Sequence, residues 1–88
     1  MNNTKAAGAI TTTDMEIAAR ITNGLIVRGI DKKSLAEKIG LSYSTLRRSL
    51  EQDRGDRRSL TILEIGKIAN ILEVSPAALL PETFKDAA

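Results

Sequence analysis

The segment DKKSLAEKIGLSYSTLRRSL, from Asp31 to Leu50, carries the pattern that most constrains what this chain can fold into. It contains two short amphipathic stretches with a glycine, Gly40, between them. Glycine readily adopts the left-handed conformation that ends a helix, and Ser42 is a residue type favoured as a helix N-cap. We therefore expect helices over 32–39 and 43–52 that close on one apolar seam. This arrangement is a helix-turn-helix, and its second helix can enter the major groove of DNA.

Helix signals recur in the rest of the chain, and no segment gives a convincing strand signal. A capping box at Thr13 and Glu16 predicts a helix over 14–28, and a second capping box predicts one over 61–72. A serine followed by a proline predicts a short fifth helix over 76–80. The expected fold class is all-α, a compact bundle of five short helices. Its core must be aliphatic, because only 2% of the residues are aromatic.

Length and composition indicate one folded domain, since the chain has 88 residues and 42% of them are hydrophobic. We expect a flexible N-terminal tail over 1–12, a helix-turn-helix domain over 13–82 and a short C-terminal tail over 83–88. Gly24 lies inside the first expected helix, where a glycine costs about 1 kcal/mol relative to alanine. We therefore expect a neighbouring element to approach the backbone closely at that position.

The basic residues gather around the expected helix-turn-helix. The stretch 28–58 holds nine Lys or Arg and five Asp or Glu, a net charge of +4, whereas the rest of the chain holds four and six, a net charge of −2. A charged stretch alone is more often a solvated surface. Its position here favours a surface that faces the phosphates of a nucleic acid.

Several residue types are absent, and their absence removes whole classes of function. There is no Cys and no His, so we expect no disulfide and no thiolate or imidazole metal site. Neither a glycine-rich phosphate loop nor a cluster of carboxylates is evident, so we expect no enzyme, no cofactor, no metal and no small-molecule ligand. No apolar run approaches the roughly 20 residues that span a bilayer. We expect no membrane partner and a cytoplasmic, nucleoid-associated protein, in the host cytoplasm if a phage encodes it.

Two stretches, ARITNGLIVRGIDKKSLAEKIGLSYSTLRRSL and LTILEIGKIANILEVSPAALL, resemble the phage repressor and Cro-like (lambda-repressor-like) helix-turn-helix superfamily. The resemblance runs from about Ile17 to Leu80, and its most specific part is LAxxxGLSxSTLxR over Leu35–Arg48. It implies a five-helix domain that binds operator DNA with its third helix in the major groove. It also implies roles for single residues: Ser42 and Tyr43 open the reading helix, Ser44 and Arg48 face base edges, and Lys32 meets a phosphate.

The chain departs from the family pattern at two positions. Lys32 stands where the family often has glutamine, and Ser49 stands where it tends to have an apolar residue. Lysine can hold a phosphate but lacks the amide that would brace the first reading side chain. The serine leaves the rotation of the helix open, and with it whether Arg47 or Arg48 points deepest into the groove.

Guanidinium, hydroxyl and ammonium groups in this pattern suit contacts to base edges and contacts to phosphates. A guanidinium donates two parallel hydrogen bonds to guanine O6 and N7, although Arg48 or Arg47 could instead pair with Glu51 along the helix. The tyrosine could meet a thymine methyl or a phosphate, or merely cover the turn. The lysines at the start of the second helix could meet phosphates or simply be exposed. The predicted base-reading residues are Tyr43, Ser44, Arg47 and Arg48, and the predicted phosphate-binding residues are Lys32, Lys33, Ser42, Thr45, Arg54, Arg57 and Arg58.

The expected function is a sequence-specific DNA-binding transcriptional regulator of the Cro or short-repressor type, from a phage or a bacterium. It would bind double-stranded DNA at an operator and exclude polymerase, as a monomer or as a weak homodimer. Two alternatives stay open. One is a protein-interaction module on the same fold, antitoxin-like or polymerase-binding, with an exposed apolar surface or tail. The other is a recombination accessory factor that bends or bridges DNA.

Overall fold

The computed structural model describes the backbone of residues 2–51 and 55–81, and the side chains from 13 onward within those ranges. The described residues contain helices and no strand, as predicted. The helices, in chain order, are α1 (Asn2–Arg28), α2 (Lys32–Ile39), α3 (Tyr43–Leu50), α4 (Ile62–Leu72) and a 3₁₀ helix, η1 (Pro76–Leu79).

The described chain therefore has four α-helices, and the prediction of five is wrong. The segment 76–80 forms only a single 3₁₀ turn, and its N-cap residue Ser75 makes no side-chain cap hydrogen bond. Pro81 gives the physical reason, because a proline pushes the residue before it out of the helical region. Leu80 accordingly has φ −92° and ψ 149°, an extended conformation that ends the turn.

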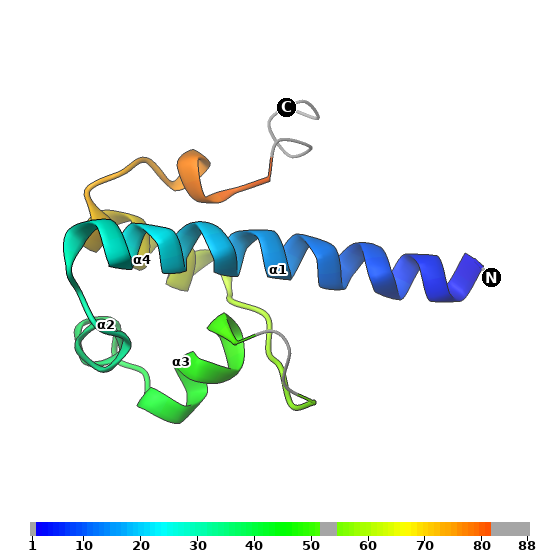
Figure 1. Ribbon diagram of the computed structural model, residues 1–88, viewed down its shortest axis with the longest axis horizontal. Helices are drawn as coiled ribbons and strands as arrows, with labels where there is room; N and C mark the ends of the chain where they lie inside the picture. The colour runs from blue at the N-terminus through cyan, green and yellow to red at the C-terminus, as the bar shows by residue number, and fades with distance from the viewer. Residues whose placement is uncertain (1, 52–54, 82–88) are drawn as a thin grey trace.

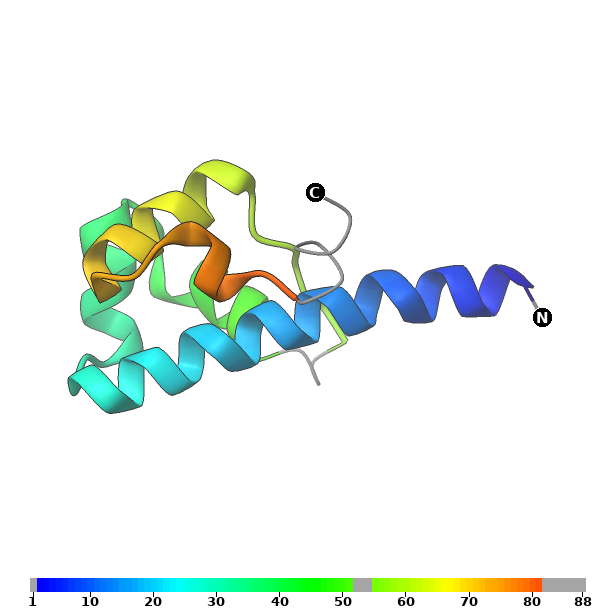
Figure 2. The same ribbon diagram turned by 90° about the horizontal axis from the view of Figure 1, so that it is seen from above.

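The first helix is longer than its capping signals predict. It begins at Asn2, whereas the capping box at Thr13 and Glu16 predicts a start at 14. The segment 2–12 contains three alanines and no proline, so the helix can continue through it, and a capping signal inside a continuous helix has no exposed end to cap. This segment projects past the other elements (Figures 1 and 2). That it is flexible stays a prediction.

The elements pack around α1. In Figure 1, α2 and α3 lie below α1 and α4 lies behind it, and η1 covers α4 and α1 from above. The core between them is aliphatic, as predicted. Its buried residues are Ile17, Ala18, Ile21, Leu25, Leu35, Ala36, Ile39, Leu46, Leu50, Ile65, Ile68, Ala69, Leu72 and Leu79.

A close approach at Gly24 is confirmed. A Cβ atom added there would lie 2.9 Å from Cδ1 of Leu72, which is buried in α4. The glycine thus lets α1 and α4 pack at short range and brings α4 against the same core that supports the helix-turn-helix. None of the helices described is long and apolar enough to cross a membrane.

Candidate nucleic-acid interface

The turn between α2 and α3 forms through the residues that predict it. The Asp31 side chain caps α2 by accepting a 2.7 Å hydrogen bond from the Ser34 amide, and this bond lowers the pKa of the Asp31 carboxyl. Gly40 then ends α2 with φ 79°, in the left-handed region. Ser42 caps α3, its Oγ accepting a 3.1 Å hydrogen bond from the Thr45 amide. The described residues 31–50 therefore form the predicted helix-turn-helix.

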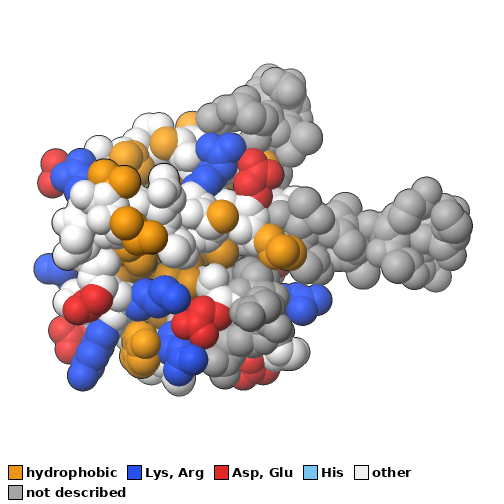
Figure 3. All heavy atoms as spheres, viewed as in Figure 1, with side chains coloured by type: hydrophobic (Ala, Val, Ile, Leu, Met, Phe, Trp, Pro, Cys, Tyr) orange, Lys and Arg blue, Asp and Glu red, His pale blue; other side chains and the backbone are white. Residues whose placement is uncertain are grey.

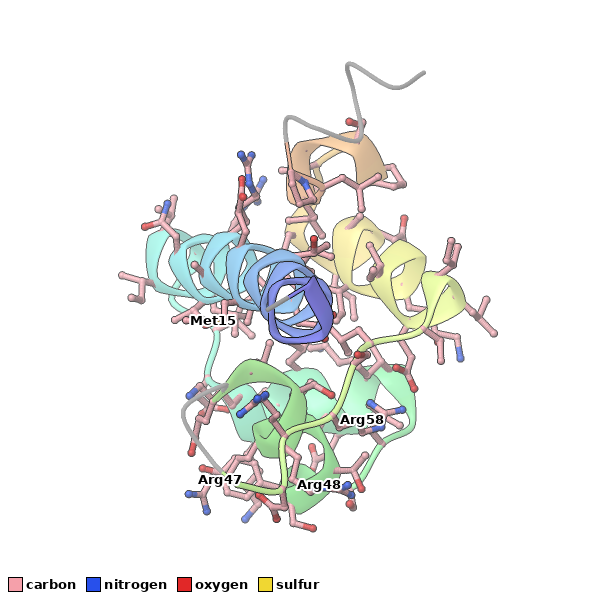
Figure 4. All side chains as sticks on the ribbon, turned by 90° about the vertical axis from the view of Figure 1, so that its right-hand side faces the viewer. Met15, Arg47, Arg48 and Arg58 are labelled. Carbon is pink, nitrogen blue, oxygen red and sulfur yellow. The ribbon has the colours of Figure 1, made fainter. Side chains whose placement is uncertain are left out.

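The two sides of α3 differ in character. Leu46, Ser49 and Leu50 are buried against the rest of the protein. Tyr43 and Ser44, in the first turn, are exposed. Figure 4 shows Arg47 and Arg48 at the outer edge of the molecule, away from α1. The outward side of α3 thus brings together the four predicted base-reading residues, Tyr43, Ser44, Arg47 and Arg48.

Three hydroxyl groups cluster at the N-terminal end of α3. The Ser42 hydroxyl donates to Thr45 Oγ1 at 2.8 Å, and it lies 3.5 Å from the Ser44 hydroxyl. All three lie beside the amide groups of the first helical turn, where the partial positive charge of the helix end favours an anion. Ser42 and Thr45, both predicted to bind phosphate, are therefore placed together.

Glu51 joins two of the predicted DNA-contacting cations. Its carboxylate accepts from Arg47 twice, from Nε to Oε2 at 3.1 Å and from Nη2 to Oε1 at 3.1 Å. Oε2 also accepts from Lys32 Nζ at 3.2 Å, across 19 residues of sequence. The hydrogen bonds from Arg47 and then from Lys32 lower the pKa of Glu51 to about 2, so the carboxylate is ionised at neutral pH. The hydrogen bonding between Arg47 and Glu51 also raises the pKa of Arg47.

Arg47 also lies over the only tyrosine of the chain. Its guanidinium carbon is 5.5 Å from the centroid of the Tyr43 ring, within the range of a cation–π contact. Arg47 therefore lies along the helix surface between an aromatic ring and a carboxylate. The alternative that an arginine pairs with Glu51 is the arrangement found, and the arginine is Arg47.

Arg48 contacts the loop that follows α3. Its Nε donates to the backbone carbonyl of Asp56 at 2.8 Å and lies 3.8 Å from Asp56 Oδ2. The carbonyl of Arg48 accepts a 2.9 Å hydrogen bond from the Arg58 amide. One side-chain and one backbone hydrogen bond thus join the end of α3 to the loop.

The guanidinium of Arg58 is hydrogen-bonded to α3 and α4. Its Nη1 donates to the hydroxyl of Ser49 at 2.8 Å, and its Nη2 donates to Glu64 Oε2 at 2.7 Å. The Arg58 side chain is 23% exposed and that of Glu64 is 13% exposed. Arg58 is thus hydrogen-bonded within the protein, and its phosphate contact stays a prediction. The sequence signal for this network is the serine at an apolar family position, because a buried hydroxyl needs a hydrogen-bond partner.

The remaining predicted phosphate contacts are spread around this face. Lys33 is exposed in the first turn of α2, and Arg57 is exposed in the loop. Arg54 lies outside the described residues. In Figure 3, basic and acidic side chains alternate over the lower part of the molecule, where α2 and α3 lie. The part of the surface seen in Figure 3 therefore carries a mixed charge.

Residues 20–81 match the family model of the Cro/C1-type HTH DNA-binding domain. The chain belongs to this family. The expected resemblance to Cro-like helix-turn-helix proteins is therefore confirmed, and the matched range runs from the second half of α1 to just past η1.

One solved structure shares this fold, the crystal structure of FeII HppE. The match has a TM-score of 0.65 and 25% sequence identity, and it covers 78% of this chain. It covers 34% of the HppE chain, so the present chain spans about a third of that protein's length. No curated protein matches the chain. In this Cro/C1-type domain, α3 is the second helix of the helix-turn-helix and its outward side is the candidate interface.

Proposed function

We propose that this Cro/C1-type domain is a sequence-specific DNA-binding transcriptional regulator of the Cro or short-repressor type. It would occupy an operator with α3 in the major groove and exclude polymerase by occupancy. The observation that carries the proposal is the outward side of α3. There Ser44 and Arg48 lie one turn apart on the side of α3 away from the core, and the exposed Tyr43 lies beside Ser44 in the first turn.

Arg48 is the proposed base reader. A guanidinium held at Nε by a loop carbonyl has a fixed orientation, and its two terminal nitrogens match guanine O6 and N7. Ser44, one turn earlier on the same side, and Tyr43, in the same first turn, would meet neighbouring base edges. Lys33, Arg57 and the hydroxyl cluster of Ser42 and Thr45 would bind phosphates and set the register.

A weak homodimer on DNA belongs to the same proposal. Two copies would read half-sites about 34 Å apart, one helical turn of DNA. Three exposed apolar side chains of α1, Met15, Ile26 and Val27, are 50%, 73% and 75% exposed and offer a surface for a second copy. Figure 4 shows Met15 on the side of α1 away from α4. Sedimentation equilibrium with and without duplex DNA tests this part, and a monomer on a two-half-site duplex would contradict it.

We also propose that the chain acts by binding and not as an enzyme. Two of the described acids have structural roles, because Asp31 caps α2 and Glu51 pairs with Lys32 and Arg47. The proposed interface on α3 is the same for a repressor and an activator, and for a phage and a bacterial protein. The binding assay below therefore addresses the common part of these alternatives.

The deciding experiment is fluorescence anisotropy with selected and random duplexes at several salt concentrations. Wild type should prefer the selected duplex, with a log–log salt slope of about −0.9 for each of roughly 4–6 phosphates. Arg48→Ala should lose about 10- to 100-fold of that preference, the value of one bidentate base contact. Lys67→Ala removes the same charge from an exposed position on α4 and should keep the preference.

The other outcomes are equally informative. Uniform weakening of Arg48→Ala on both duplexes would make Arg48 a phosphate contact. Absence of binding by the wild type at low salt would reject the DNA-binding proposal and favour a protein-interaction module on this fold. A strong bend in the bound duplex, measured by energy transfer between its ends, would favour a recombination accessory factor.

A further inference from the structure

Glu51 lies at the C-terminal end of α3, at the border of the candidate interface. It is an acid at a place where an operator would bring phosphates close. Its side chain is 25% exposed, and it accepts hydrogen bonds from Arg47 at 3.1 Å and from Lys32 at 3.2 Å. Lys32 begins α2 and Arg47 belongs to α3, so one carboxylate bridges both helices of the helix-turn-helix.

The bridge changes the charge that the interface offers to DNA. Lys32, Arg47 and Glu51 together carry one positive charge, whereas the two cations alone would carry two. Non-specific binding depends on the number of phosphates that cations neutralise, so a carboxylate that occupies two cations weakens it. Specific binding depends on side chains that meet base edges, and Glu51 does not hold Arg48 in any hydrogen bond described here.

The bridge also fixes where Arg47 points. Two parallel hydrogen bonds from a guanidinium to a carboxylate define its orientation, and the Tyr43 ring lies beneath the same group at 5.5 Å. Arg47 is thereby held along the helix surface. Arg48, the next residue, contacts the loop and not this bridge.

We propose that Glu51 is a positioning residue for specificity: it holds Lys32 and Arg47 so that Arg48 reads the bases while binding to random DNA stays weak. The inference rests on the proposed DNA-binding function. Glu51 acts through the two cations and makes no contact with DNA itself. Removing its charge releases two cations that attract any duplex.

The test compares Glu51→Gln with Glu37→Gln, in anisotropy titrations on the selected and the random duplex. Glu37 is an exposed acid on α2, so its variant makes the same change in net charge. Glu51→Gln should raise the affinity for the random duplex on the order of 10-fold at low salt. Its salt slope should steepen by about 1 to 2, because one or two more phosphates are neutralised. The ratio of selected to random affinity should fall, whereas Glu37→Gln should change both affinities by less than about 2-fold.

A double variant separates a released cation from a simple change of charge. Arg47→Gln in the Glu51→Gln background removes one released cation and should bring the random-duplex affinity back toward wild type. If the double variant binds random DNA as well as Glu51→Gln does, the positioning role of Glu51 is overturned. An unchanged affinity and salt slope in Glu51→Gln overturns it too.

An NMR measurement on the free protein keeps this proposal distinct from the proposed function. The Arg47 Nε–H resonance should be protected from exchange in wild type and lose that protection in Glu51→Gln. If wild type and Glu51→Gln give identical spectra, the hydrogen bonds between Glu51 and Arg47 do not form in solution, and the positioning role of Glu51 is overturned even if wild type binds DNA. Conversely, a wild type that shows the bridge but binds no duplex would reject the DNA-binding function, and with it any role of Glu51 in specificity.

Discussion

The guanidinium of Arg58 donates a 2.8 Å hydrogen bond to the hydroxyl of Ser49, a polar side chain that is only 1% exposed inside α3. The other terminal nitrogen of Arg58 bonds to Glu64 Oε2. Glu64 uses its second oxygen, Oε1, to accept from the Thr61 amide at 2.9 Å, which caps α4. A single loop residue therefore links α3 to the start of α4.

Arg58→Ala should lower the free energy of unfolding. It leaves the Ser49 hydroxyl and one Glu64 oxygen without the hydrogen bonds that Arg58 gives them, which costs about 2 kcal/mol of the free energy of unfolding. Urea denaturation followed by circular dichroism measures the change. Arg57→Ala, an exposed neighbour in the same loop, should stay within about 0.5 kcal/mol of wild type. Equal stabilities of the two variants would show that the Arg58 network contributes nothing.

Two of the left-handed helix ends, at Gly40 and Glu73, predict opposite responses to substitution. Gly40 has φ 79° and Glu73, the C-cap of α4, has φ 60°. Gly40→Ala should lower the free energy of unfolding by about 1 kcal/mol, because a Cβ is unfavourable in this region. Glu73→Gly should raise it by up to about 1 kcal/mol, less the small value of its exposed ion pair with Arg28. Thermal unfolding of both variants checks the sign, and a shift in the same direction would contradict the prediction.

Ser42→Ala should weaken α3 at its first turn. The variant loses the acceptor for the Thr45 amide, and removing such an N-cap typically costs about 1 kcal/mol. Ser42→Asp restores the acceptor and should recover the stability, which chemical denaturation can measure. The aspartate should still bind DNA more weakly than wild type, since it adds a negative charge at the helix end proposed to face phosphate. If Ser42→Asp recovers the DNA affinity of wild type as well as its stability, Ser42 does not contact DNA.

Acid should open the Glu51 bridge. The pKa of Glu51 falls from the usual 4.5 to about 2, so its contribution to stability is complete above about pH 4.5 and is lost as the pH falls toward 2. The difference in unfolding free energy between wild type and Glu51→Gln should therefore be largest near neutral pH and shrink through this window. Denaturant titrations at pH 7, 4 and about 2.5 measure it. A difference independent of pH would show that the bridge does not stabilise the fold.

The local elements of the helix-turn-helix could be predicted from the sequence almost residue by residue. The expected helix over 32–39 is α2, and the expected cap at Ser42 opens α3, which ends at Leu50 and not near 52. Capping residues and apolar spacing act within one or two turns, so the sequence shows them directly. The same local signal misplaced the start of α1, because Thr13 and Glu16 match a cap whether or not the helix continues before them.

The contacts between elements could not be predicted in this way. Lys32 and Glu51 are 19 residues apart, and their ion pair depends on the angle between α2 and α3. The hydrogen bonds of Arg58 to Ser49 and Glu64 depend on how the loop returns to α3, and the sequence of the loop does not show them. Ser49 was recognised as a departure from the family, but its partner could not be named without the packing of α4.

Tyr43, exposed in the first turn of α3, is the only tyrosine in the chain, which has no tryptophan. Excitation near the red edge of phenol absorption therefore addresses a single side chain, and that side chain lies beneath the Arg47 guanidinium. The fluorescence of Tyr43 therefore reports on the candidate interface without an added label. Quenching on addition of duplex would come from this one ring, with no interior chromophore to subtract.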